Sequence, residues 1–396
     1  MPYFDHNATT PLAPRAREAW LRAVDESWQN PSSPYREAAR VRIRLDQARE
    51  QLALLLGCPA ARVVFNSGAT EGANAVFAHW AGSLAADRVV AVNPTEHPCV
   101  LEAARQSFPP ERLVELRIDR NGVVDLAALA ALLAGGADAP RAAVGAVAVM
   151  AANNETGVIQ PWREIGALCR AHGAAYFCDG AQWLGKVTAA GLGGAGWVTA
   201  SAHKFGGPKG TGFLVVPEQA EGFHAQRGGE QEGGRRAGTE DYPAVAALVA
   251  ALADAEGSRV LRETERQRWR DSFLARLHAV LPGARVVGAG AERLWNTVSL
   301  LLPHSENHRW VLKLDRRGFQ VSTGSACATG REGPSHVLAA LGLAPDEARR
   351  VIRVSAGWET SAEDWSRLAE ALIETEAELR AASPDLVKTA WAARGN

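Results

Sequence analysis

Short apolar runs alternate with longer runs of helical spacing between about residues 60 and 216, and this alternation constrains the fold most strongly. The apolar runs contain few polar positions, as expected for strands that are covered on both faces. Strands that alternate with helices predict a mostly parallel sheet with helices on both sides. The predicted strands are 62–65, 88–92, 113–116, 143–150, 175–178, 198–201 and 212–216. The predicted helices between them include 71–80, 100–107, 126–133 and 162–172.

Further helical runs lie on both sides of this region, at 14–27 and 36–56 before it and at about 243–281 after it. The rest of the chain shows the pattern strand, strand, helix, strand, helix. We therefore expect an α/β protein with a large domain of residues 14–259, whose sheet has seven strands. Residues 1–13 and 260–396 would form a smaller α/β domain. The arginines of 259–276 alternate with acidic residues at helical spacing, which predicts a solvated helix face.

Charge and cysteine content limit the class of protein. The 396 residues include 43 Lys and Arg and 44 Asp and Glu, for a net charge of −1, which argues against nucleic acid or an anionic membrane as the partner. No basic region followed by an apolar stretch opens the chain, and the longest apolar run, 142–152, is shorter than the roughly 20 residues that cross a bilayer. The five cysteines are odd in number and lack Cys-x-x-Cys spacing, so we expect a cytoplasmic protein without disulfides or a metal site. Cys58, Cys169 and Cys178 have apolar neighbours and are predicted to be small buried side chains.

A lysine and an aspartate follow two of the predicted strands. Lys204 is followed by small residues and glycines, so its amine can point into a cleft, where burial favours a nucleophilic amine suited to a Schiff base. Asp179 comes directly after strand 175–178, where doubly wound sheets place ligand-binding residues. A carboxylate there can keep a pyridine nitrogen protonated. The alternatives are a surface lysine and an aspartate that caps the next turn.

Two other strand ends carry residues suited to a phosphorylated ring. The segment Ser-Gly-Ala-Thr-Glu at 67–71 joins a strand to a helix, and free N–H groups at a helix N-terminus bind phosphate. Thr70 adds a hydroxyl. His97 follows strand 88–92 and could stack on a ring and move protons near neutral pH. A plain helix cap and a structural histidine are the alternatives.

The fifth cysteine has different surroundings. Cys327 lies in Ser-Thr-Gly-Ser-Ala-Cys-Ala-Thr-Gly at 322–330, where small residues predict an accessible loop. A reactive thiolate must be reachable and able to move. A buried cysteine is the alternative.

Taken in order and spacing, these segments resemble the cysteine desulfurases of the class V aminotransferase group, which have the type I fold of pyridoxal 5'-phosphate (PLP) enzymes. The resemblance runs from Asp-His-Asn-Ala-Thr-Thr-Pro at 5–11 to Ile-Arg-Val-Ser at 352–355. Its most specific pieces are Asn-Asn-Glu-Thr-Gly at 153–157, the segment 201–204, Gly-Arg-Arg-Ala-Gly-Thr-Glu at 234–240, and Gly-Ser-Ala-Cys at 324–327. The loop after Cys327 has a length similar to that of the long-loop branch, the housekeeping and nitrogen-fixation type.

The resemblance implies a role for each site residue. Lys204 would bind PLP covalently and move the Cα proton, Asp179 would pair with the pyridine nitrogen, and Cys327 would accept the sulfur. Arg353, with Asn30, would clamp the substrate carboxylate, a task that suits a bidentate guanidinium. The other implied contacts are Gln182 and Asn154 at the phenolic oxygen or substrate, His97 over the ring, Ala69, Thr70, Ser201 and His203 at the phosphate, and Thr239 from a second subunit.

The implied activity converts L-cysteine to L-alanine and leaves a persulfide on Cys327 for an acceptor protein, in a homodimer. Iron–sulfur cluster assembly, tRNA thiolation, cofactor synthesis and DNA sulfur modification are all open destinations. The alternatives are a selenocysteine lyase, a PLP-dependent cysteine lyase that needs no thiol, an aminotransferase, and a non-catalytic sulfur-relay scaffold. Gly233, Tyr35 and Trp358 depart from the family pattern, and Arg331 and Glu332 add charge to the cysteine loop. These departures bear on which acceptor the protein serves.

Overall fold

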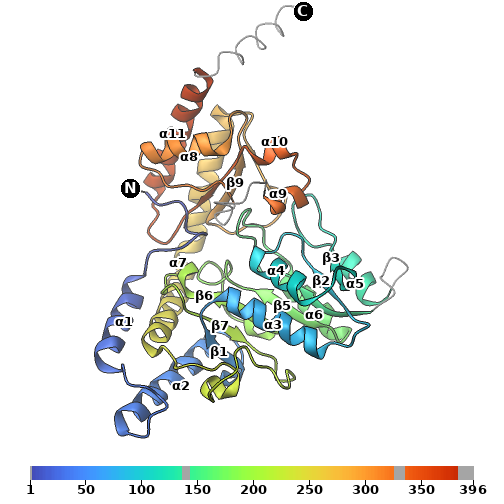
Figure 1. Ribbon diagram of the computed structural model, residues 1–396. Helices are drawn as coiled ribbons and strands as arrows, with labels where there is room; N and C mark the ends of the chain where they lie inside the picture. Colours follow the sequence, from blue (N-terminus) through green and yellow to red (C-terminus); the bar gives the residue numbers. More distant parts are fainter. Residues whose placement is uncertain (1, 136–142, 325–334, 382–396) are drawn as a thin grey trace, which may run out of the picture. The chain divides into compact units, whose positions relative to one another are not determined.

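The computed structural model describes residues 2–135, 143–324 and 335–381 (Figure 1). The chain divides into two compact units. The large unit comprises Thr9–Asn154 and Val158–Val260, and the C-terminal unit comprises Met1–Ala8, Glu155–Gly157 and Leu261–Asn396. The domain limits expected from the sequence, 14–259 against 1–13 with 260–396, stay a prediction.

A seven-stranded sheet forms the centre of the large unit, with the strand order β1-β7-β6-β5-β4-β2-β3. Four neighbouring pairs are parallel, and only the two pairs that involve β7 are antiparallel. The predicted mostly parallel seven-stranded sheet is therefore confirmed. The strands are β1 (Val63–Asn66), β2 (Val89–Val92), β3 (Leu113–Glu115), β4 (Val144–Ala148), β5 (Ala175–Asp179), β6 (Trp197–Ser201) and β7 (Gly212–Val215).

Helices cover the sheet because its strands are apolar on both faces. Every residue of β2 and β4 is buried, as expected for central parallel strands. Helix α3 packs on β5, β6 and β7, and a Cβ at its Gly72 would lie 2.2 Å from Thr199 Oγ1 of β6. This glycine therefore sets how closely α3 approaches the sheet.

The α-helices of the large unit are α1 (Pro14–Glu26), α2 (Arg36–Leu56), α3 (Ala69–Ser83), α4 (Pro98–Ser107), α5 (Leu126–Leu133), α6 (Trp162–Ala171) and the first part of α7 (Tyr242–Val280). Short 3₁₀ turns are η1 (Ala60–Arg62), η2 (Pro110–Arg112), η3 (Leu192–Gly194), η4 (Ala202–Lys204) and η5 (Gln231–Gly234). Local sequence signals explain where several of these helices begin or end. Asp125 caps α5 by accepting from the N–H groups of Ala127 and Ala128, and α2 ends at Gly57, whose φ is +73°.

An antiparallel three-stranded sheet, β10-β9-β8, forms the C-terminal unit. The N-terminal residues join it, because Asp5 bridges Ser355 and Tyr3 bridges Gln320. Phe4, Trp310 and Trp365 belong to its apolar core. Its elements are the end of α7, β8 (Arg285–Val286), β9 (Thr297–Leu301), α8 (Asn307–Arg316), α9 (His336–Ala340), α10 (Pro345–Ala348), β10 (Val351–Ser355) and α11 (Ala362–Ala381). The two short helices α9 and α10 were not expected from the sequence pattern.

The predicted solvated face of 259–276 is wrong at two positions. Arg266 and Arg270 are buried. The guanidinium of Arg266 lies 4.7 Å from the centre of the Trp295 ring and donates to Trp358 O, and Arg270 donates to Leu294 O. Backbone carbonyls, an aromatic face and, at Arg270, the carboxylate of Asp271 replace water around these charges. The sequence of one helix does not reveal the carbonyl and aromatic partners.

The predicted burial of the cysteines is confirmed at Cys169 and Cys178, which are fully buried, whereas Cys58 is only half-buried.

Among the helices that the structure describes, none combines the length and the apolar character needed to cross a membrane. Within the same described residues, no group of three or more His, Cys, Asp or Glu side chains is arranged to hold a metal ion.

Candidate active site

Most of the predicted site residues of the large unit lie at the carboxyl ends of the parallel strands and of β1. Because these strands point the same way, the segments that follow them meet along one edge of the sheet. The residues that this edge brings together are Ala69 and Thr70 after β1, Glu96 and His97 after β2, Asn154 after β4, Asp179 and Gln182 at β5, and Ser201, His203 and Lys204 at β6.

A tight cradle lies at the start of α3. Gly68 has a φ of +142°, and a Cβ there would come within 2.9 Å of Ser201 Oγ. The backbone N–H of Ala69 donates to Ser201 Oγ at 2.8 Å. Thr70 is exposed at the same turn. The small residues therefore leave backbone N–H groups of a 15-residue helix close to a hydroxyl, an arrangement suited to a phosphate.

Asp179 is a buried carboxylate at the end of β5. Its Oδ1 accepts from the N–H of Ala181 at 2.8 Å. Burial raises the pKa of Asp179 to about 6, while the Ala181 N–H and the charge of Lys204 lower it in part. Gln182 is buried on the turn that follows. A carboxylate in this setting is stabilised by a cationic N–H group that donates to it.

Glu96 lies next to His97 and was not singled out from the sequence. Its side chain is fully buried, and Oε1 accepts from the N–H of Met150. Burial, followed by the charge of Asp179, raises the pKa of Glu96 well above its usual value. Glu96 therefore holds its proton more tightly than an exposed glutamate does, close to Asp179. The position after strand 88–92 singled out His97 alone, because the burial of Glu96 depends on residues of other strands, such as Met150 after β4 and Asp179 of β5.

His203 and Lys204 lie on η4, directly after β6, and both are half-buried. His203 Nδ1 lies 3.1 Å from Thr9 Oγ1, and its carbonyl accepts from the N–H and hydroxyl of Thr10. Burial lowers the pKa of His203 to about 4, helped by the charges of Lys204, Lys209 and Lys186. The imidazole of His203 is consequently neutral near pH 7.

His97 is the N-cap of α4. Its Nδ1 accepts from the N–H of Cys99 at 3.2 Å, which leaves the proton on Nε2 in the neutral ring. Asn154 is half-buried, and the neighbouring Asn153 donates to the carbonyl of Thr95 at 2.9 Å. That bond ties the segment after β4 to the segment after β2, which carries His97.

Thr239 is exposed and lines a cavity of about 230 Å³ in the large unit. Phe65, Ser67 and Glu240 also line this cavity, together with Arg236, whose Nε pairs with Glu71 at 3.0 Å. Asn30 lies in the same unit, in the turn after α1, and is exposed. Its Oδ1 accepts from the N–H of Ser32.

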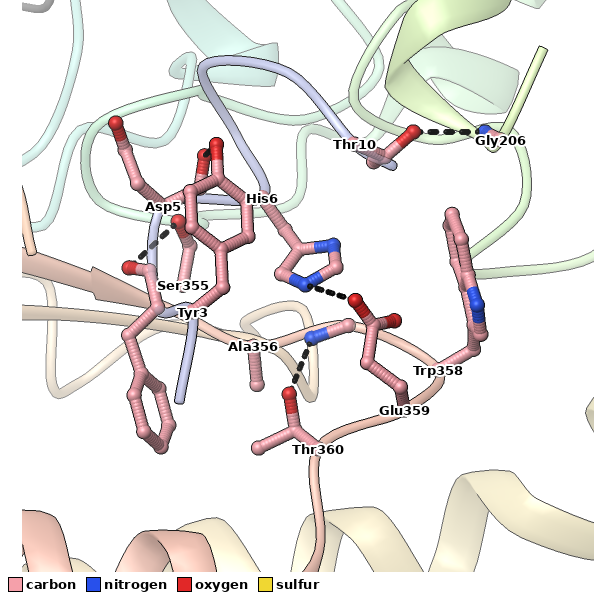
Figure 2. A network of polar contacts seen from close by, with 12 residues as sticks. Tyr3, Asp5, His6, Thr10, Gly206, Ser355, Ala356, Trp358, Glu359 and Thr360 are labelled. Carbon is pink, nitrogen blue, oxygen red and sulfur yellow. Dashed lines mark hydrogen bonds and ion pairs between the residues drawn. The ribbon is translucent and has the colours of Figure 1, made fainter. Parts of the chain in front are cut away.

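Arg353 belongs to the C-terminal unit and is fully buried on β10. Its Nη2 pairs with Asp5 at 2.7 Å, and its Nη1 donates to Gly324 O at 2.7 Å. Figure 2 shows a second pair of this unit, in which His6 Nε2 lies 3.3 Å from Glu359. Cys327 lies outside the described residues.

A family model describes the chain almost from end to end. The model of the class-V aminotransferases matches residues 2–368. The chain therefore belongs to the class-V aminotransferase family.

Several relatives that match over nearly their full length are cysteine desulfurases. The cysteine desulfurase of Cereibacter sphaeroides is 36% identical over 96% of this chain and 97% of its own length. That of Klebsiella pneumoniae is 34% identical over 96% of this chain and 94% of its own. Solved structures agree: a NifS-like protein superposes with a TM-score of 0.86 at 26% identity, over 96% of this chain and all of that one. The structure of SspA in complex with cysteine gives a TM-score of 0.75 at 26% identity, over 90% of this chain and 99% of that one.

Proposed function

We propose that this protein is a PLP-dependent cysteine desulfurase that converts L-cysteine to L-alanine and carries the sulfur as a persulfide on Cys327. The observation that carries the proposal is the edge of the sheet where Asp179, Lys204 and the α3 cradle meet. The cysteine desulfurases that match this chain over nearly their full length support it. SspA, which has this fold, binds cysteine.

The residues of the large unit fit PLP. Gly68 leaves no room for a side chain above Ser201, so the start of α3 with Ala69, Thr70, Ser201 and His203 would hold the phosphate. Asp179 would accept from the pyridine N–H, which relieves the cost of its buried charge. The other residues that would hold the cofactor are Lys204 by a covalent bond, His97 over the ring, Gln182 and Asn154 at the phenolic oxygen, and Thr239 of a second subunit. When bound, PLP withdraws electrons from the substrate, which labilises the Cα proton and the Cβ–S bond.

The residues of the chain then bind and orient the substrate and move its proton. Lys204 Nζ takes the proton from the substrate Cα and returns a proton to carbon, as a lysine with an accessible free amine can do. Arg353 binds the substrate carboxylate, with Asn30 assisting. Because Arg353 Nη2 already pairs with Asp5, the substrate carboxylate has to displace or share this contact.

The proposed sulfur transfer needs no further oxidant, because the bonds broken and formed account for all the electrons. The Cys327 thiolate attacks the sulfur of L-cysteine, the Cβ–S bond breaks, and a new S–S bond forms. The electron pair of the broken bond stays on the carbon side, which takes up protons and leaves as L-alanine. The terminal persulfide sulfur then passes to an acceptor protein. We expect Gly233, Tyr35 and Trp358 to influence which acceptor binds.

The test is a single-turnover reaction of the full-length, PLP-loaded protein with L-cysteine. Alanine is measured by chromatography, and sulfur on the Cys327 peptide by mass spectrometry. Cys327→Ala should keep the visible absorbance of the cofactor but lose both alanine and protein-bound sulfur. Lys204→Ala should lose the absorbance of the covalently bound cofactor itself.

Cys58→Ala is the matched control, since Cys58 is half-buried in the large unit and has no proposed part in the reaction. It should behave like the unchanged protein. Alanine formation by Cys327→Ala at the original rate would refute the role of the thiol. Parallel reactions with L-selenocysteine test the alternative, a selenocysteine lyase. Turnover of L-selenocysteine by Cys327→Ala would favour this alternative.

A further inference from the structure

Glu155 is a buried carboxylate of the C-terminal unit, and the proposed function gives it no part. It is only 2% exposed. Its turn is fixed within that unit, because the carbonyl of Gly157 accepts from the N–H of Leu294 at 2.8 Å. Gly157 has a φ of +74°, and a Cβ there would lie 2.7 Å from Thr297 Cβ of β9. The side chain of Glu155 therefore starts from a well-fixed point next to β9.

One carboxylate oxygen of Glu155 meets the residues on both sides of the segment that carries Cys327. The hydroxyl of Ser335 donates to Glu155 Oε2 at 2.6 Å. A Cβ at Gly324, whose φ is +96°, would lie 3.4 Å from the same oxygen. Cys327 lies between these two residues in the sequence, within 325–334, which are outside the described residues. Gly324 and Ser335, the flanks of this segment, are thus brought together at one oxygen atom.

The bond to Glu155 also sets the direction of the Ser335 hydroxyl. Ser335 is the N-cap of α9, and its Oγ accepts from the N–H of Leu338 at 3.3 Å. A hydroxyl has one proton to donate, and giving it to Glu155 leaves a lone pair free for the N–H of Leu338. Glu155 therefore helps to fix the place where α9 begins.

The other flank is held by Arg353. Its Nη1 donates to the carbonyl of Gly324 at 2.7 Å, and Arg353 exchanges two backbone hydrogen bonds with Ser322, at 3.0 and 2.7 Å. Burial raises the pKa of Glu155, while the hydrogen bond from Ser335 and the charges of His336 and Arg353 oppose this effect. Gly324 is thus bound to Arg353 through its carbonyl, and its lack of a side chain lets it lie close to Glu155.

We propose that Glu155 is a positioning residue for the thiol of Cys327: it holds Ser335 and packs against Gly324, and so fixes both flanks of the segment that carries the thiol. This proposal rests on the proposed function, in which Cys327 accepts the sulfur. Holding the two flanks together lowers the conformational entropy that the segment loses when its thiol meets the substrate. The rate of a group transfer depends steeply on how well the reacting atoms are placed.

The first experiment is hydrogen–deuterium exchange of the full-length, PLP-loaded protein, followed by mass spectrometry. Glu155→Ala should raise exchange in peptides that end at Gly324 and in peptides that cover α9. Peptides from β9 and from the large unit should keep their exchange. Glu155→Gln retains an oxygen that accepts from Ser335, so its exchange should stay close to that of the unchanged protein.

The second experiment is a single turnover at saturating L-cysteine, with sulfur measured on the Cys327 peptide. Glu155→Ala should slow the transfer about tenfold, whereas Glu155→Gln should stay within about threefold of the unchanged protein. The cysteine concentration that gives the half-maximal rate should change by less than about twofold in both, because Arg353 keeps its pair with Asp5.

Ser335→Ala removes the same hydrogen bond from the other side. It should slow the transfer by a similar factor, and Ser335→Ala combined with Glu155→Ala should be no slower than the slower single variant. Asp125→Ala is the matched control, because it removes a helix cap from α5 in the large unit. Its transfer rate and its exchange at α9 should equal those of the unchanged protein.

Unchanged exchange at both flanks in Glu155→Ala would overturn the proposal, and so would an unchanged transfer rate. Glu155→Gln as slow as Glu155→Ala would also overturn it, since glutamine keeps the bond to Ser335. Raised exchange throughout the C-terminal unit in both variants would show a structural role alone.

These outcomes are distinct from a failure of the proposed function. If the unchanged protein makes no alanine from L-cysteine, the proposed activity fails, whereas the exchange pattern still tests the hold of Glu155 on the two flanks. If the unchanged protein loads sulfur onto Cys327 and Glu155→Ala does so equally fast, only the role of Glu155 fails.

Discussion

Arg353 and Asp5 form an ion pair at 2.7 Å, although 348 residues separate them in the chain. The arginine is fully buried, and the carboxylate is about one-fifth exposed. The pair links the first residues of the chain to β10. It also engages the guanidinium that the proposed function assigns to the substrate carboxylate.

Asp5→Asn should therefore weaken the fold and change substrate binding. Removing one partner of a buried pair leaves a charge without compensation and costs about 3 kcal/mol in unfolding free energy. The same change frees Arg353 Nη2, so KM for L-cysteine should fall. Denaturant unfolding and steady-state kinetics measure the two effects.

Asp346→Asn is the control for this pair, because Asp346 is exposed and pairs with Arg349 on the surface. Its effect on stability should stay below about 1 kcal/mol. An Asp5→Asn protein with unchanged stability and a raised KM would show that Asp5 supports the substrate rather than competing with it.

Asp179→Asn should remove a pH dependence of stability in the cofactor-free protein. The folded-state pKa of Asp179, about 6, lies above the usual 3.8, so the folded chain binds this proton more tightly than the unfolded chain does. Stability is thus highest below the unfolded value and falls as the pH rises from about 4 to 6. The cost at neutral pH is on the order of 3 kcal/mol.

The measurement is the unfolding free energy at pH 4.5 and pH 7.5 for both proteins, with the exposed Asp87→Asn as the control. The unchanged protein should lose more stability across this range than Asp179→Asn. Affinity for PLP should drop in the variant, because its amide is uncharged. Parallel pH profiles for the two proteins would contradict the high proton affinity of Asp179.

Glu232→Gln should weaken the contact between α2 and β1 and so lower the stability of the large unit. Glu232 is almost fully buried, accepts from both terminal nitrogens of Arg49 at 2.6 and 2.8 Å, and also accepts from the N–H of Phe65. Loss of the charge leaves the largely buried Arg49 without an anionic partner, although it still donates to the carbonyl of Val63, and this costs about 3 kcal/mol. Glu37→Gln, at an exposed pair with Arg40, should be nearly silent in the same thermal unfolding assay. Equal melting temperatures for the two variants would contradict this assignment.

Gly357→Ala should destabilise the C-terminal unit by direct collision with His6. The new Cβ would lie 1.8 Å from His6 Cε1, in the region that Figure 2 shows. Overpacking of this kind costs about 1–3 kcal/mol or more. In contrast, Gly82→Ala in α3 meets no atom within 4 Å and should stabilise the protein by up to about 1 kcal/mol.

The double variant His6→Ala with Gly357→Ala tests this cause. If the clash is responsible, the two changes together should cost less than their separate effects added. Purely additive effects would place the strain of Gly357→Ala somewhere else.

Local sequence signals predicted most of the large unit. The strands were recognisable because their residues are apolar throughout, and α2 could be bounded because Gly57 ends it with a left-handed conformation. The candidate residues at the edge of the sheet were found because each follows a predicted strand. These signals depend on neighbours in the chain and so can be read from the sequence.

Features that depend on distant segments could not be predicted. Glu155–Gly157 belong to the C-terminal unit although the residues on both sides belong to the large unit. Arg266 and Arg270 have a surface-like pattern, yet they are buried and donate to the carbonyls of distant residues, Trp358 and Leu294. Glu96 and Lys186 looked like ordinary charged residues, because their burial comes from other strands and turns.

The pairing of Asp5 with Ser355 has a consequence for biosynthesis. Residues 3–5 are synthesised long before their β partners at 320 and 355. Residues 3–5 therefore stay unpaired while the large unit, which ends at Val260, is synthesised. A substitution that weakens the pairing of Asp5 with Ser355 would therefore act at this late step of folding.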